Sequence, residues 1–152
     1  MKVLYHYTAE YHLPSILEEK KLRLSESNLK NYAKQGYDWE AYNRGELKLY
    51  KPVVWMTEAE EPDVESIGLY SAVDKTAIKI TIKKQAYFKK WKQWSRANGI
   101  EKEWARILER GKAANIWWIS ELEVPFSGIV RIENRYTGEV YYTNPDLIDK
   151  LN

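Results

Sequence analysis

The chain has 152 residues, with no cysteine, two histidines and only seven glycines. Without cysteine there are no disulfides and no thiolate metal ligands. The two histidines, His6 and His12, do not form a convincing zinc-binding pattern, so we expect no metal site. The sequence also lacks a basic-then-apolar leader and any apolar run of about 18 residues. We therefore expect a cytoplasmic protein that does not contact a membrane.

Several chemistry-bearing motifs are missing as well. The sequence contains neither G-x-G-x-x-G nor G-x-x-x-x-G-K-[ST], so nothing supports a Rossmann dinucleotide site or a phosphate-cradling loop. It also lacks the G-x-S-x-G turn of many serine hydrolases. Any nucleotide chemistry in this chain would have to use a site built without a glycine-rich loop.

Aromatic residues are abundant, with seven tryptophans and twelve tyrosines. A hydrophobic content of 44% in 152 residues suits one globular domain, and we expect residues 1–152 to form a single domain. Such an aromatic excess supplies core volume and flat surfaces for stacking. Composition alone does not distinguish these two uses.

Charge is unevenly distributed along the chain. Residues 75–112 contain 12 of the 24 Lys and Arg residues but three of the 22 acidic ones, a net charge of +9, whereas the rest carries −7. A basic segment next to tryptophans is typical of surfaces that bind nucleic-acid strands. The candidate phosphate contacts are Lys83, Lys84, Lys89, Lys90 and Lys92.

A structural interpretation competes with this one. Trp91 and Trp94 follow the three- and four-residue spacing of an amphipathic helix, which indicates a buried stripe with solvated lysines around it.

The N-terminal run Val3-Leu-Tyr-His-Tyr-Thr8 predicts a strand over about residues 2–7. Side chains alternate along a strand, so His6 and Thr8 share one face and Tyr5 and Tyr7 the other. A neutral imidazole both donates and accepts hydrogen bonds, which suits the orientation of a hydroxylated ligand. The alternative is a core histidine with satisfied hydrogen bonds.

The remaining pattern predicts an α+β protein whose strands form two small packed sheets. The alternation of Ile78, Ile80 and Ile82 with polar residues is the clearest strand signal. The other expected strands cover residues 53–57, 115–124, 128–133 and 139–142, with a hairpin turn at Thr137-Gly138 and an acidic turn at residues 58–62. The expected helices cover residues 14–21, 29–42, 85–97, 102–110 and 145–151.

Two glutamates interrupt the apolar run Ile116-Trp-Trp-Ile-Ser-Glu-Leu-Glu-Val124. On a continuous strand Glu121 and Glu123 would share a face with Trp117 and Ile119. A carboxylate on a half-buried strand requires a partner or a function. The structural alternative pairs it with a cation on a neighbouring strand, such as Arg131.

The order of these motifs resembles the ADP-ribosyltransferase fold. The resemblance consists of His6-Tyr-Thr8, the short helix that ends in a basic turn, the strand Val53–Thr57 and the late Ser120-Glu-Leu-Glu-Val-Pro125. It implies an α+β fold with a split β-sheet sandwich and flanking helices. It also implies NAD as cofactor, bound without a glycine loop, and a toxin-like transfer of ADP-ribose to a nucleic acid or protein acceptor.

The resemblance further implies roles for individual residues. His6 would hold the nicotinamide ribose, Trp55 and Tyr70 would pack on the nicotinamide ring, and Glu121 would contact the ribose hydroxyl. A two-residue difference in register would give Glu123 that role; otherwise Glu123 is the candidate general base for the acceptor. The NAD-binding set implied in this way is His6, Tyr7, Thr8, Trp55, Thr57 and Tyr70.

Two other functions fit the sequence. One is a non-catalytic nucleic-acid-binding module that uses residues 75–112. The other is an RNA 2′-phosphotransferase-like enzyme, which also uses NAD and needs a basic set around the RNA phosphate.

Overall fold

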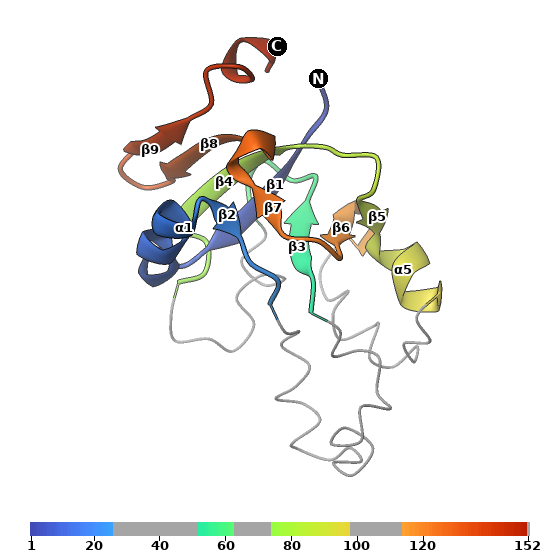
Figure 1. The fold of residues 1–152 in the computed structure, drawn as a ribbon. Helices are drawn as coiled ribbons and strands as arrows, with labels where there is room; N and C mark the ends of the chain where they lie inside the picture. The colour runs from blue at the N-terminus through green and yellow to red at the C-terminus, as the bar shows by residue number, and fades with distance from the viewer. Residues whose placement is uncertain (26–51, 63–73, 98–113, 152) are drawn as a thin grey trace.

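A computed structural model describes residues 1–25, 52–62, 74–97 and 114–151. These residues form an α+β protein with a seven-stranded antiparallel sheet, a second sheet of two strands and two short α-helices (Figure 1). The large sheet has the order β5-β6-β3-β1-β4-β8-β9. The α+β prediction is confirmed, although most of the strands described join one large sheet rather than two small ones.

The first half of the large sheet is built on β1 (Val3–Thr8) and β4 (Ile78–Lys83). These strands are in register from Val3 opposite Lys83 to Thr8 opposite Ile78. β8 (Ile129–Asn134) and β9 (Val140–Thr143) extend the sheet from β4. The expected strands at residues 2–7 and 78–83 and the hairpin of β8 and β9 are confirmed.

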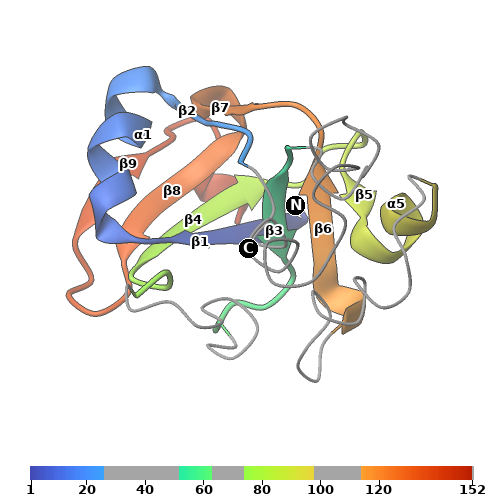
Figure 2. The same cartoon turned by 90° about the horizontal axis from the view of Figure 1, so that it is seen from below.

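The other half consists of β3 (Val54–Thr57), β6 (Trp117–Ser120) and the two-residue β5 (Lys89–Lys90). β3 and β6 are in register along four residues, from Val54 opposite Ser120 to Thr57 opposite Trp117. By contrast, β1 meets β3 in register at Tyr5 opposite Thr57. Figure 2 shows β3 crossing β1 at a steep angle, with β6 alongside β3. The two halves are therefore joined by a short seam.

One face of the large sheet carries the core. Leu4, Met56, Ile80 and Ile132 are buried there, and Ile16 of α1 (Leu13–Glu19) packs over them. The small sheet of β2 (Lys21–Leu22) and β7 (Val124–Pro125) covers the same face through Leu22 and Val124. Burial of these side chains removes apolar surface from water, which is the main favourable term in folding.

Helix α1 begins one residue before the expected position and ends at Glu19, two residues before the expected end. Pro14 lies in its first turn, where the absence of an N–H costs nothing. At its C-terminus Lys20 adopts a left-handed conformation, with φ of 58°, and its N–H bonds to the Ile16 carbonyl. This conformation allows the chain to reverse into β2.

Three predicted elements are wrong in extent. The helix expected from residue 85 begins at Trp91 (α5, Trp91–Ala97), because Lys89 and Lys90 pair with β6 instead. The strand expected over residues 115–124 ends at Ser120, whose hydroxyl bonds to both the N–H and the carbonyl of Leu122 and so forms a turn. At the C-terminus, a single 3₁₀ turn (Ile148–Lys150) replaces the expected helix. The helices predicted at 29–42 and 102–110 lie outside the described residues.

Candidate functional site

His6 lies on β1 at the seam between the two halves of the large sheet. It stands opposite Ile80 of β4, and its Nδ1 lies 2.7 Å from the backbone carbonyl of Trp55 on β3. A carbonyl oxygen only accepts, so Nδ1 carries the proton and donates it. Burial lowers the pKa of His6, because the charged imidazolium is poorly solvated there. The ring is therefore neutral near pH 7, and its Nε2 carries an unprotonated lone pair.

The seam explains how this contact arises. Beyond Tyr5 and Thr57 the backbones of β1 and β3 are not in register, and the His6 side chain provides the hydrogen bond that reaches Trp55. A side chain thus replaces backbone pairing between the two central strands. The same ring presents a hydrogen-bond acceptor, Nε2, at the seam.

The sheet alternation distributes the predicted NAD-binding residues over both faces. Opposed residues point to the same side, so Tyr5, Thr57 and Trp117 share a face, and alternation adds Trp55 to it. His6 lies on the other face, the one that α1 covers. Thr8 is buried on the same side as His6, as the sequence predicted. A ligand that touches both His6 and Trp55 would therefore have to lie at the seam.

Tyr7 and Thr57 hold the acidic turn at residues 58–62. The Tyr7 hydroxyl donates to the Ala59 carbonyl over 2.9 Å and also contacts the Glu60 carbonyl, while Thr57 Oγ1 accepts the Ala59 N–H over 3.1 Å. Burial, together with the nearby negative charge of Glu61, raises the pKa of Tyr7. These contacts give both side chains a structural role. Tyr70 lies outside the described residues.

Trp55 belongs to a cluster of tryptophan rings on its face of the sheet. Its ring centroid lies 4.9 Å from that of Trp91 and 6.1 Å from that of Trp117, and Trp91 lies 5.6 Å from Trp94. Trp91 and Trp94 are buried, as the helical spacing predicted. We call Trp55, Trp91, Trp94 and Trp117 the tryptophan cluster. Trp55 remains half-buried, so part of its ring is accessible.

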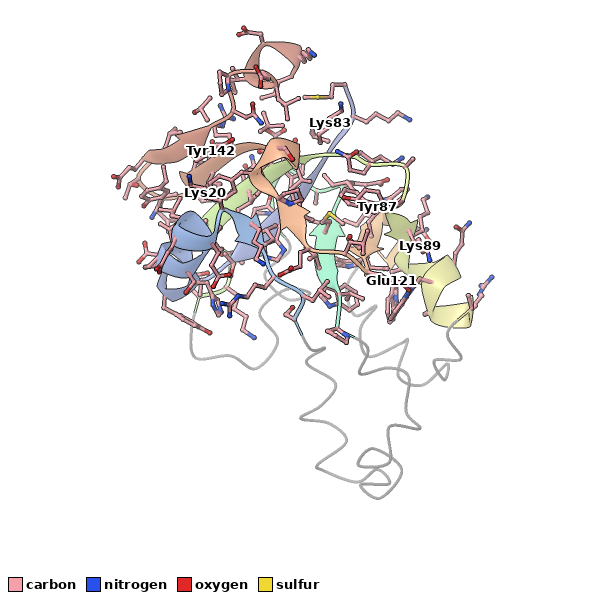
Figure 3. All side chains as sticks on the ribbon, viewed as in Figure 1. Lys20, Lys83, Tyr87, Lys89, Glu121 and Tyr142 are labelled. Atoms are coloured by element: carbon pink, nitrogen blue, oxygen red, sulfur yellow. The ribbon has the colours of Figure 1, made fainter. Side chains whose placement is uncertain are left out.

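Glu121 lies at the end of this cluster, in the turn after β6. The Trp94 indole N–H donates to Glu121 Oε1 over 2.7 Å, and Lys89 Nζ lies 3.6 Å from Oε2. Figure 3 labels Lys89 and Glu121, which project toward each other from neighbouring elements. The Glu121 side chain is 29% exposed. Its carboxylate is thus anchored from a buried ring and still reaches solvent.

Glu123 points elsewhere. It forms an ion pair with Lys21 of β2 over 3.1 Å and is 43% exposed. The next residue, Val124, is buried in the core on the face that carries His6. The expectation that both glutamates share a strand face is therefore wrong, because the chain turns at Ser120. The structural alternative, a cation on a neighbouring strand, is met by Lys89 and Lys21, whereas Arg131, the example given for it, pairs with Glu133 over 2.5 Å.

The sequence did not identify Trp94 and Lys89 as partners of Glu121. Trp94 was predicted to be buried, but a local spacing does not indicate which group its N–H contacts 27 residues away. Lys89 was predicted as a phosphate contact. Its pairing with Glu121 depends on β5, a strand that the helical pattern concealed.

The other candidate nucleic-acid lysines have mixed surroundings. Lys84 Nζ lies 4.3 Å and Lys90 Nζ 5.6 Å from the ring centroid of Trp118. Both cations therefore cover an aromatic ring of the protein itself, which is a stabilising arrangement. Two further lysines are half-buried: Lys83 at the end of β4 and Lys92 in α5. Lys84 and Lys90 thus share Trp118, whereas Lys89 lies at Glu121.

Among the described residues, no cluster of three or more His, Asp or Glu side chains could hold a metal ion. Within the same ranges, no helix is long and apolar enough to span a bilayer. Comparison of the whole chain with known proteins gives no further guidance: no family model, no curated protein and no solved structure matches it.

Proposed function

We propose that this protein binds NAD at the seam between β1 and β3 and transfers ADP-ribose to a nucleic acid or protein acceptor. The observation that carries the proposal is the 2.7 Å hydrogen bond from His6 Nδ1 to the Trp55 carbonyl. It fixes a neutral imidazole whose Nε2 can only accept, which suits a ribose hydroxyl.

The arrangement of the sheet supports the same proposal. An ADP-ribosyltransferase-like split sheet requires its central strands to separate around the cofactor. Here β1 and β3 are in register at Tyr5 opposite Thr57, and β3 then crosses β1 steeply. In this proposal the nicotinamide ring packs on the accessible part of Trp55.

Glu121 is the carboxylate that we assign to the reacting ribose. Cleavage of the bond to nicotinamide gives the ribose carbon an oxocarbenium-like positive charge, which a fixed carboxylate stabilises. In the transfer nicotinamide would leave with the electrons of the broken bond, the ribose carbon would bond to the acceptor nucleophile, and the nucleophile's proton would pass to a general base. Glu121 is oriented by Trp94 and belongs to the same cluster of side chains as Trp55. Glu123, next to β7, is the candidate general base.

Incubation with NAD labelled in its adenylate half tests this function. We expect transfer of label to an acceptor, or hydrolysis to ADP-ribose and nicotinamide when no acceptor is present. Parallel reactions with single-stranded DNA, RNA and a protein mixture identify the acceptor class. Absence of both turnover and NAD binding at millimolar cofactor would contradict the proposal.

The two alternatives receive less support. For a nucleic-acid-binding module, Lys89 and Lys90 are exposed, but Lys84 and Lys90 lie on Trp118 and Lys89 is also drawn to Glu121. The RNA 2′-phosphotransferase-like function needs the same lysines gathered around one phosphate. Release of a 2′-phosphate from RNA in the presence of NAD would favour that function instead.

A further inference from the structure

Helix α5 and strand β5 lie beside the candidate catalytic carboxylate, and neither was expected to contact it. Trp94 of α5 is 3% exposed, and its indole N–H donates to Glu121 Oε1 over 2.7 Å. Lys89 of β5 places its ammonium 3.6 Å from Oε2 of the same side chain. Two elements far from Glu121 in sequence therefore contact its two oxygens.

We propose that Trp94 is a positioning residue, which orients the Glu121 carboxylate and favours its charged form. The inference rests on the proposed function, because it concerns how Glu121 is held for the reaction. A hydrogen bond donated to a carboxylate stabilises the ionised state relative to the protonated one. A rigid ring that contacts Trp91 also limits the side-chain orientations available to Glu121.

Lys89 contributes less than Trp94. Its side chain is 54% exposed, and the 3.6 Å separation exceeds a normal N–H···O hydrogen bond. Exposed ion pairs of this kind are screened by water and salt. The buried, short contact from Trp94 therefore orients the carboxylate more strongly than Lys89 does, and Lys89 adds a weak electrostatic attraction.

The turn at Ser120 is what directs Glu121 away from the sheet. β6 ends there because the Ser120 hydroxyl bonds to the Leu122 backbone. Glu121 then leaves the sheet while staying next to β5, which pairs with Ile119 through Lys89. Trp94, one turn into α5, approaches Glu121 from that side.

The test compares two substitutions that remove the same chemical group. Trp94→Phe removes the N–H that contacts Glu121 and keeps an aromatic ring. Trp118→Phe is the matched control, because Trp118 Nε1 donates to a different glutamate, Glu58, over 3.1 Å. Both variants are assayed for kcat, KM for NAD, the pH dependence of kcat and melting temperature.

We expect Trp94→Phe to lower kcat by about tenfold or more, with a change in KM of less than about threefold. The acidic limb of its pH–kcat profile should move to higher pH, a change that a purely structural role would not produce. Trp118→Phe should keep kcat within about twofold and leave the pH profile unchanged. In a Glu121→Gln background, Trp94→Phe should have little further effect on kcat, because residues that act as a unit are not additive.

Three results would overturn the inference. The first is an active Trp94→Phe variant with the wild-type pH profile, which would leave the proposed function intact. The second is a loss of kcat in Trp94→Phe that adds fully to that of Glu121→Gln. The third is a wild-type protein without NAD turnover, which would also remove the proposed function itself.

Discussion

The indole N–H of Trp94 donates a 2.7 Å hydrogen bond to Oε1 of Glu121 and joins helix α5 to the turn after β6. Through Trp91, the same helix contacts Trp55 at 4.9 Å between ring centroids. A carboxylate, a short helix and a central strand are thereby connected by aromatic side chains. Because Trp55 also accepts the hydrogen bond from His6, the contacts continue to β1.

Glu121→Gln keeps the shape of the side chain and removes its charge. We expect a loss of roughly a hundredfold or more in ADP-ribose transfer, about 3 kcal/mol, because the charge matters most when the ribose becomes cationic. NAD binding should change little, and stability should fall by about 1 kcal/mol, since Trp94 keeps a neutral acceptor. Activity, NAD titration and melting temperature measure the three effects.

Glu123→Gln is the companion variant, because Glu123 differs from Glu121 in its surroundings and in exposure. A larger loss in Glu123→Gln than in Glu121→Gln would transfer the catalytic role to Glu123. Full ADP-ribose transfer activity in both variants would exclude Glu121 and Glu123 as catalytic residues.

His6 gives the stability of the protein a defined pH dependence. Its folded-state pKa lies below the ordinary value of 6.5, so below pH 6.5 the unfolded chain binds a proton that the folded protein resists. The free energy of unfolding should therefore decrease as the pH falls below 6.5. His6→Asn places an amide N–H near the position of Nδ1 without a titrating ring, so this variant should lose less stability than the wild type between pH 6.5 and 5.

Two measurements on the histidine variants complete this test. NAD binding should weaken in His6→Asn, because the acceptor at Nε2 is lost. His12→Asn is measured alongside, because desolvation and the charge of Lys75 lower the pKa of His12 as well, so that it contributes to the acid sensitivity with the same sign. Equal pH dependence in the wild type and His6→Asn would show that burial of His6 does not govern the acid sensitivity.

Salt dependence distinguishes the two uses of the lysines. If nucleic acid is the acceptor, the affinity should fall steeply with salt, because each phosphate contact releases counterions. Lys83→Met and Lys92→Met should weaken that affinity and reduce the salt slope. Lys84→Met and Lys90→Met should instead lower stability by about 0.5–1 kcal/mol each through the loss of their contacts with Trp118. Fluorescence anisotropy at two salt concentrations and thermal unfolding measure these effects, and salt-independent binding would argue against phosphate contacts.

Lys20 carries a conformational cost at the end of α1. Its φ of 58° is one that glycine adopts without penalty, so Lys20→Gly should stabilise the protein by about 0.5–1 kcal/mol. Gly138, with φ of 76°, provides the reciprocal change, and Gly138→Ala should destabilise by about 1 kcal/mol although nothing lies within 4 Å of the added Cβ. Denaturant unfolding measures the change in the free energy of unfolding for both variants. A destabilised Lys20→Gly protein would show that the Lys20 backbone is not strained.

Local pattern was sufficient where an element depends on its own residues. The isoleucines of β4 alternate with period two, and the strand has the predicted bounds at Ile78 and Lys83. Pro14 indicated the start of α1, and Thr137-Gly138 the turn of the hairpin. The face that His6 shares with Thr8 followed from the same alternation.

The local sequence pattern did not predict contacts between segments that are distant in the sequence. The sequence pattern predicted Lys89 and Lys90 as part of a helix, but their backbones pair with β6 and form a strand. Glu121 was predicted as a strand residue; here a local turn, in which the Ser120 hydroxyl bonds to Leu122, ends β6 one residue earlier, and the contact with Trp94 is the distant one.

The sequence by itself determined the α+β class, the strands with strong alternation and the residue types available for chemistry. The tertiary structure alone decided that His6 bonds to Trp55, that Trp94 holds Glu121 and that Glu123 pairs with Lys21. The physical reason is that side-chain periodicity reports which face of an element is buried. The partner of a polar group depends instead on which distant backbone or side chain the packed sheet brings within hydrogen-bonding distance.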